Sequence, residues 1–222
     1  MTKLIFVSDT HNKLNQFAIP IGDILIHCGD WLGAGRESEF NNFLKHLSKL
    51  PHKHKIIIAG NHDRIGEELP ILVKSEITAI PGCHYLNNSG ITIEGIRFWG
   101  SPDTPEFFAW AFNRTPEQLQ AIWELIPTDT DVLITHGPPY GILDYVVNRW
   151  SPHGKHVGDP ALLAKVMEIK PKIHAFGHIH CGYGQHVENG VKFLNCSNLG
   201  EDYKYANPPH EINYGDLIQP HV

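Results

Sequence analysis

Residues 4–8 (Leu4-Ile5-Phe6-Val7-Ser8) form a short apolar run, and Asp9-Thr10-His11 follows it directly. A run of this length and composition, bounded by loop residues, indicates a buried β-strand. The same arrangement, an apolar run followed by a polar cluster, recurs four times. The runs at 23–28, 55–59, 131–135 and 172–176 are followed by Gly29-Asp30, Gly60-Asn61-His62-Asp63, His136-Gly137 and Gly177-His178-Ile179-His180, respectively. Open α/β sheets bind ligands at the carboxyl ends of their strands, so we expect the five clusters to form one site.

The amino-terminal third alternates strands with a helix. Apolar residues recur at spacings of three and four over 37–50, which predicts a helix that ends before Pro51. This helix separates the strands predicted at 24–28 and 55–59. Alternation of this kind favours a largely parallel sheet and an α/β fold.

The middle of the chain has a different pattern. Short strands are predicted at 83–87, 91–94 and 96–100, and turn residues separate them at Asn88-Ser89-Gly90 and Gly95. We therefore expect a second sheet here, antiparallel or mixed. Farther along, the patterns predict helices at 115–126 and 160–169 and strands at 131–135, 172–176 and 191–195.

Two segments have no predicted strand or helix. Residues 137–158 are rich in Pro, Gly and aromatic residues, and we expect a long connection that either shapes a pocket or packs on the surface. The stretch from Glu201 is expected to wrap the surface. No linker or repeat is evident, so we expect residues 1–222 to form a single domain.

The composition limits which partners and locations are expected. The chain has 222 residues, 41% of them hydrophobic, and a formal net charge of -6 without a basic stripe, so we expect no long nucleic acid as partner. Its four cysteines form no Cys-x-x-Cys pair, which favours reduced thiols in a cytoplasmic protein. The first predicted strand leaves no room for a signal peptide, and no apolar run reaches the ~20 residues that span a membrane.

The polar clusters together offer seven metal-ligand side chains, none of them a thiolate, which suits hard or borderline divalent ions. The candidate ligands are Asp9, His11, Asp30, Asn61, His136, His178 and His180. Asp-x-His or Gly-Asp alone is more commonly a turn or a cap, but five clusters after five strands favour a metal site. Seven donors suit two ions that share one carboxylate. Two carboxylates leave two dications with a net positive charge, which attracts a phosphate.

These residues occur in the order D-x-H, G-D, G-N-H-D, H and G-H-x-H, from Asp9 to His180. The pattern resembles that of the calcineurin-like metallophosphoesterase superfamily. Further stretches resemble its metallophosphoesterase-domain (MPPED-type) group; they include 26–30, 136–139, 154–158 and 177–184.

The resemblance implies an αββα sandwich of two mixed β-sheets flanked by helices, with a dinuclear centre at the strand ends. By motif position, one ion would be held by Asp9, His11, Asp30 and His180, and the other by Asp30, Asn61, His136 and His178. Asp30 would bridge them, and His62 would be a proton donor or phosphate contact. The Ser/Thr phosphatase branch carries a second Asp and an Arg after its Gly-Asp. Here Trp31-Leu32-Gly33 follows Asp30 instead, so the partner that orients His62 is unidentified.

The function expected from these residues is hydrolysis of phosphodiesters, with cyclic nucleotides as candidate substrates, by a hydroxide that bridges two metal ions. Asp30, Asn61 and His62 are the expected catalytic residues. A phosphomonoesterase and a catalytically silent metal-binding scaffold remain alternatives. Manganese is the leading candidate for both ions, with iron, zinc, nickel and cobalt open. The expected partner is a small phosphoester, and the sequence does not determine the oligomeric state.

Overall fold

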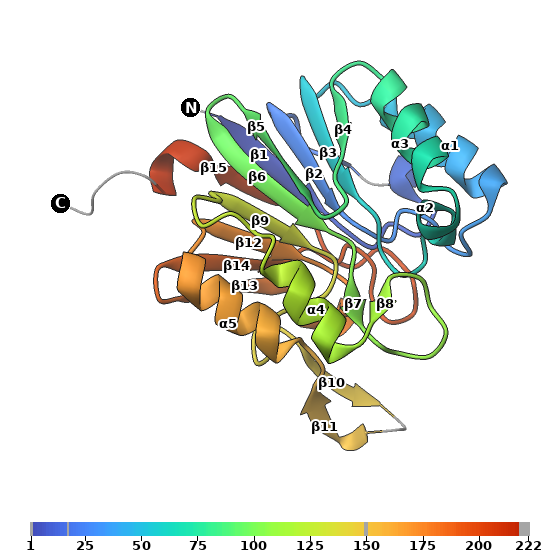
Figure 1. The fold of residues 1–222 in the computed structure, drawn as a ribbon. Helices are drawn as coiled ribbons and strands as arrows, with labels where there is room; N and C mark the ends of the chain where they lie inside the picture. Colours follow the sequence, from blue (N-terminus) through green and yellow to red (C-terminus); the bar gives the residue numbers. More distant parts are fainter. Residues whose placement is uncertain (1, 17, 149–150, 218–222) are drawn as a thin grey trace.

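Two β-sheets face each other at the centre of the molecule (Figure 1). The structure is a computed structural model that describes residues 2–16, 18–148 and 151–217. Trp150, in the 137–158 segment, lies outside the described residues. The first sheet contains, in spatial order, β15 (His210–Asn213), β1 (Lys3–Val7), β2 (Ile24–Cys28), β3 (His54–Ile58) and β4 (Cys83–Tyr85). Strands β1 to β4 are parallel, and β15 pairs antiparallel with β1.

The second sheet is also mixed. It contains, in spatial order, β13 (Gly184–Glu188), β14 (Val191–Asn195), β12 (Ile173–Phe176), β9 (Val132–Thr135), β6 (Ile96–Ser101) and β5 (Ser89–Ile93). The four inner strands are parallel, and each outer strand pairs antiparallel with its neighbour. Two smaller pairs lie outside the sheets, β7 (Thr104–Pro105) with β8 (Asn113–Arg114) and β10 (Tyr145–Asn148) with β11 (Ser151–His156).

Helices cover the outer face of each sheet (Figure 1). The first sheet is covered by α1 (Glu37–Leu47), α2 (Arg64–Glu68) and α3 (Pro70–Ala79), and the second by α4 (Pro116–Trp123) and α5 (Pro160–Ile169). Short 3₁₀ helices lie at Leu14–Gln16, His180–Gly182 and Tyr214–Leu217. This architecture confirms the expected αββα sandwich of two mixed sheets. Thr115 and Asp159 cap α4 and α5, since each accepts a hydrogen bond from a backbone N–H of its helix.

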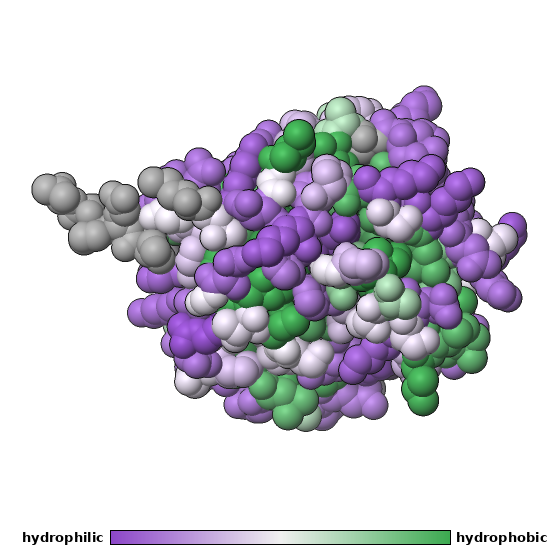
Figure 2. Space-filling view, turned by 90° about the horizontal axis from the view of Figure 1, so that it is seen from above, coloured by the Kyte–Doolittle hydropathy of each residue, from purple (hydrophilic) through white to green (hydrophobic). Residues whose placement is uncertain are grey.

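Three apolar layers hold the sandwich together. The middle layer lies between the sheets, where Phe6 and Ile26 meet residues such as Phe98 and Ile134. A second layer packs α1 and α3 on the first sheet, and a third packs α4 and α5 on the second. Because β1, β2 and β3 are buried on both faces, they read as continuous apolar runs. Hydrophilic residues cover most of the face seen in Figure 2 and surround several hydrophobic patches.

Several expectations from the sequence were wrong in detail. Residues 83–85 do not join the second sheet, because β4 pairs with β3 in the first sheet and only the 89–101 hairpin enters the second. The 137–158 segment is not an irregular connection, since it contains the β10–β11 hairpin. The stretch from 201 does not only wrap the surface, since β15 extends the first sheet. Helices α2 and α3 and strand β13 were not predicted from the sequence.

The register places the strand ends side by side. Val7 pairs with His27, Cys28 with Ile58, and Ala175 with Ile134, so the parallel strands of each sheet end at nearly the same level. A bridge between Ser8 and Ser197 joins the first sheet to the second just beyond these ends. The polar clusters that follow the strands therefore converge in one region.

Candidate metal centre

The predicted ligands lie in the loops directly after β1, β2, β3, β9 and β12. Four of them have left-handed backbone, namely Asp9 (φ 54°), His11 (φ 38°), Asp30 (φ 55°) and His178 (φ 67°). Residues other than glycine rarely adopt this conformation, and it concentrates at functional sites. Backbone hydrogen bonds hold these loops, from Asp9 N–H to the Gly29 carbonyl and from His11 N–H to the Asp30 carbonyl, both at 3.0 Å.

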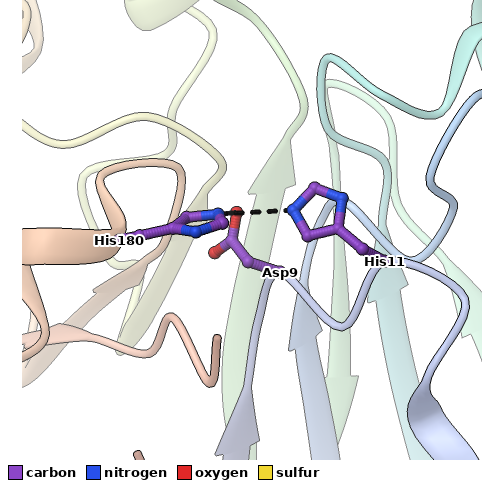
Figure 3. A group of neighbouring side chains, drawn as sticks. All are labelled: Asp9, His11 and His180. Carbon is purple, nitrogen blue, oxygen red and sulfur yellow. Dashed lines mark hydrogen bonds and ion pairs between the residues drawn. The ribbon is translucent and has the colours of Figure 1, made fainter. Parts of the chain in front are cut away.

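Asp9, His11 and His180 form the first half of the centre (Figure 3). Their candidate ligand atoms lie within 4.8 Å of one another. His180 Nε2 lies 3.5 Å from Asp9 Oδ1 and 3.3 Å from His11 Nε2. Burial lowers the pKa of His11 to about 4, although the charges of Asp30 and Asp9 oppose this shift. His11 is therefore neutral at physiological pH, the form in which imidazole binds a metal.

The second half contains Asp30, Asn61, His136 and His178. Asn61 Oδ1 lies 2.9 Å from His136 Nε2 and 2.8 Å from His178 Nδ1, and Asp30 Oδ1 lies 3.4 Å from His136 Nε2. Burial, reinforced by the charge of His136, lowers the pKa of His178 to about 4. Asp30 also groups with His11 and His62, so this carboxylate lies between the two halves.

Backbone carbonyls orient the imidazoles. The Nδ1 atoms of His11, His62, His136 and His180 lie 2.6–3.1 Å from the carbonyl oxygens of Leu32, Gly33, Cys28 and Gly200. A carbonyl can only accept, so each Nδ1 carries the hydrogen and each neutral ring presents the lone pair of Nε2. Metal-binding histidines are oriented in this way. The Nε2 atoms of His11 and His180 face each other at 3.3 Å, where two lone pairs would repel unless a proton or cation lay between them.

The pKa values of two histidines also indicate that the site favours a positive charge. Burial would lower the pKa of His136, but the charge of Asp30 and a hydrogen bond to it raise the value to about 9. The pKa of His180 is also raised to about 9, because a hydrogen bond to Asp9 and its charge outweigh burial. In turn, His136 holds the pKa of Asp30 below its usual range despite burial. The two carboxylates thus stabilise cations at both halves, and the donor set fits divalent metal ions.

Other polar groups fix the two carboxylates. Ser197 Oγ donates to Asp9 Oδ2 at 2.8 Å, and the backbone N–H of His178 donates to the same carboxylate at 3.0 Å. Asp30 Oδ1 accepts the backbone N–H of His62 at 2.8 Å. Ser197 was not predicted as a site residue, because 188 positions separate it from Asp9.

Asp63 stabilises the turn after Asn61. Its carboxylate accepts the backbone N–H of Gly60 at 2.7 Å and of Leu32 at 2.8 Å. Trp31 is a core residue. Its side chain is completely buried, its ring stacks on Phe43, and its Nε1 donates to a backbone carbonyl.

His62 is held on two sides. Its Nδ1 donates to the Gly33 carbonyl at 2.6 Å, which identifies the orienting partner that the sequence left open. Its ring stacks on Trp110, with centroids 4.3 Å apart and an interplanar angle of 27°. The guanidinium of Arg64 lies 5.4 Å from the Trp110 ring centroid and bonds the Ala109 carbonyl. Arg64 thus reaches across to the 106–112 loop.

A cavity of about 260 Å³ opens onto the centre. Its lining contains the site residues Asp30, Asn61, His62, His178 and His180, together with Phe107, Trp110, Val146, Ile179, Cys181, Glu201 and Tyr203. Phe107, Trp110 and Tyr203 were not predicted from the sequence. The apolar run at 107–112 was the available signal for the first two, whereas nothing in the local sequence marked Tyr203. Val146 shows that the 137–158 segment reaches the cavity.

The sequence model of the calcineurin-like phosphoesterase family matches residues 2–182. The chain belongs to this family. Among curated relatives, it is 37% identical over 234 residues to metallophosphoesterase domain-containing protein 1 of Homo sapiens, covering 96% of this chain and 71% of the relative. A UPF0046 protein of Caenorhabditis elegans is 33% identical, over 93% of this chain and 73% of its own length. These relatives confirm the resemblance to the MPPED-type group.

Solved structures share the phosphoesterase fold at lower identity. One crystal structure has a TM-score of 0.67 and 18% identity, and covers 88% of this chain and 90% of its own. The protein TT1561 of Thermus thermophilus has a TM-score of 0.57 and 13% identity, over 96% and 99% of the two chains. Within the described ranges, no helix of this chain is long and apolar enough to cross a bilayer.

Proposed function

We propose that this protein hydrolyses small phosphodiesters with two divalent metal ions, and that cyclic nucleotides are candidate substrates. The observation that carries the proposal is the grouping of imidazole nitrogens around two buried carboxylates, Asp9 and Asp30, beside a cavity that Asp30 lines. Cytoplasmic location, manganese as the metal and the exclusion of long nucleic acids remain predictions.

The seven predicted ligands would hold the two ions, with Asp30 shared. One ion would bind Asp9, His11, Asp30 and His180, and the other Asp30, Asn61, His136 and His178. Bound divalent ions would polarise the phosphoryl oxygens and lower the pKa of a coordinated water. The neutral amide of Asn61 adds a ligand without a negative charge, so the centre retains attraction for a phosphate.

His62 is the proposed proton donor. In its protonated form the Nδ1–H bonds the Gly33 carbonyl, which leaves the Nε2–H for the leaving oxygen. As water adds to phosphorus and the ester P–O bond breaks, this proton neutralises the departing alkoxide, and His62 regains a proton from solvent. A positioned acid contributes about 10²–10⁴-fold to the rate. His62→Ala should therefore slow alkyl esters more than p-nitrophenyl esters, whose leaving group needs no proton.

The cavity lining supports a diester over a monoester. None of the described lining residues is Lys or Arg, so positive charge within the lining comes from the centre itself. A singly charged diester needs less compensation than a doubly charged monoester. Apolar walls at Phe107, Val146 and Ile179 give room for a second ester group, and the rings of Phe107 and Tyr203 suit a flat leaving group such as a nucleoside.

The proposal is tested with metal-stripped protein, with and without added Mn²⁺, on bis-p-nitrophenyl phosphate and p-nitrophenyl phosphate. We expect manganese-dependent turnover that favours the diester, and little turnover by Asp30→Asn. Preference for the monoester would reassign the protein as a phosphatase. If neither ester were cleaved with any of the five candidate metals, the protein would be a metal-binding scaffold. Cyclic nucleotides follow as substrates once the diester preference is established.

A further inference from the structure

A tight loop at residues 200–205 lies against the metal centre, beyond the residues that match the family model. Its ends are joined by a bridge between Leu199 and Tyr205 and by a hydrogen bond from Gly200 N–H to the Lys204 carbonyl at 2.9 Å. The Gly200 carbonyl accepts the Nδ1–H of His180. The loop is therefore tied directly to a predicted ligand.

Tyr203 is the residue of this loop that faces the centre. Its ring makes edge contacts with His11 and His180, with centroids 4.8 Å and 5.2 Å away, and lies 6.4 Å from the ring of His62. It lines the cavity and remains 43% exposed. Tyr203 thus touches the first half of the centre while keeping a surface that a ligand can reach.

The backbone at Tyr203 is held in an unfavourable conformation. Its φ is 58°, a left-handed value that is uncommon for a bulky residue. Two contacts fix it there, a hydrogen bond from its N–H to the Gly200 carbonyl at 2.9 Å and another from Lys13 Nζ to its own carbonyl. Strain of this kind persists where surrounding structure enforces it, and it concentrates at ligand-binding positions.

The Tyr203 hydroxyl is available to a substrate, because no residue within 2–16, 18–148 or 151–217 forms a hydrogen bond with it. A phenol has an ordinary pKa near 10, so it is protonated and can donate at neutral pH. Since no described lining residue is Lys or Arg, a neutral donor is one of the few groups outside the centre that can bind a phosphoryl oxygen.

We propose that Tyr203 binds the phosphoester, with its ring as one wall of the site and its hydroxyl as a hydrogen-bond donor to a non-bridging phosphoryl oxygen. This inference rests on the proposed function and adds a substrate-contacting residue from outside the family motifs. A hydrogen bond to a charged oxygen corresponds to about a tenfold change in affinity or more.

The test compares Tyr203→Phe, which keeps the ring and removes the hydroxyl, with Tyr203→Ala, which removes both. Tyr205→Phe is the matched control, because Tyr205 lies two residues away and does not line the cavity. Calorimetry measures Mn²⁺ binding to each metal-free protein and then the binding of inorganic phosphate to each manganese-loaded protein. Turnover of bis-p-nitrophenyl phosphate is measured in parallel.

We expect Tyr203→Phe to weaken phosphate binding and to lower kcat/KM by about tenfold, Tyr203→Ala to lower both further, and Tyr205→Phe to match wild type. Unchanged Mn²⁺ affinity in Tyr203→Phe would support substrate contact, whereas a parallel loss of Mn²⁺ affinity would overturn it and make Tyr203 a support for the ligands. Wild-type phosphate affinity in Tyr203→Phe, with turnover intact, would refute the contact and leave the proposed function standing. If phosphate binding depended on Tyr203 but the protein turned over no ester, the contact would be supported and the proposed function refuted. A wild-type protein that binds no phosphate would overturn both.

Discussion

Gly60 lies between two predicted ligands, and adding one methyl group there should displace both. A Cβ at this position would lie 2.6 Å from the Asp30 backbone nitrogen and 2.6 Å from His136 Cε1, and closer still to Asp30 Oδ1. Ordinary contacts between such atoms are about 3.5 Å, so the neighbours must move by roughly 1 Å. The φ of Gly60 is not in the left-handed region, so the effect of Gly60→Ala is steric and local.

The expected consequence is loss of function without loss of fold. A displacement of about 1 Å near the reacting groups costs about 10²-fold in rate. We therefore expect Gly60→Ala to lower kcat for bis-p-nitrophenyl phosphate by about that factor and to weaken Mn²⁺ binding in calorimetry. Gly95→Ala is the control, since φ there is 79° and nothing lies within 4 Å. It should cost about 1–2 kcal/mol of stability through backbone strain and leave the centre intact.

The two variants separate steric displacement from general destabilisation. If Gly60→Ala bound Mn²⁺ and turned over substrate within twofold of wild type while folded, the inferred crowding between Asp30 and His136 would be wrong. If Gly95→Ala lost activity to the same extent, the loss in Gly60→Ala would reflect stability and not geometry.

Three further predictions concern single residues. Asp30→Asn should abolish turnover and weaken Mn²⁺ binding, because this carboxylate lies between the two halves of the centre; near-native turnover would remove its bridging role. Trp110→Leu removes the ring that stacks on His62, so it should slow the hydrolysis of alkyl phosphodiesters about tenfold more than that of p-nitrophenyl esters. Trp110→Phe keeps a ring and should retain most of the rate. An equal loss of rate on both substrates would argue that Trp110 does not position His62 as the acid. Burial lowers the pKa of His174 to about 3, below the 6.5 of the unfolded chain, so its contribution to stability is complete above pH 6.5 and is lost as the pH falls toward 3. Between pH 7.5 and 5, His174 should account for a decrease of about 2 kcal/mol in the free energy of unfolding. In urea unfolding, His174→Gln should therefore lose about 2 kcal/mol less stability than wild type over this pH range. An equal decrease in both proteins would show that His174 does not titrate as inferred.

Much of the fold could be predicted from local patterns. The apolar runs at 24–28 and 191–195 are strands with those bounds, and the helix at 160–169 begins and ends as its Asp159 cap and apolar spacing predict. Burial on both faces makes such strands continuously apolar, and this composition is a property of the segment itself. Shorter elements such as β13 carry a weaker local signal and were missed.

It was harder to predict which strands pair with each other. Short strands were predicted at both 83–87 and 91–94, but β4 and β5 belong to different sheets, because pairing depends on which strand edge is open in the folded chain. Strand β15 joins β1 from the opposite end of the chain, so no local pattern could reveal it.

At the candidate site, too, local features could be predicted from the sequence, whereas contacts between distant segments could not. The sequence by itself determined which seven side chains are candidate donors and what chemistry they offer, since each follows a strand in a recognisable motif. Only the tertiary structure decided what surrounds them: the Gly33 carbonyl that orients His62, the Trp110 ring stacked on it, and Tyr203 against His11 and His180. The physical reason is that strand and ligand chemistry are local properties of the chain. Orientation, burial and stacking arise from contacts between segments that only folding brings together.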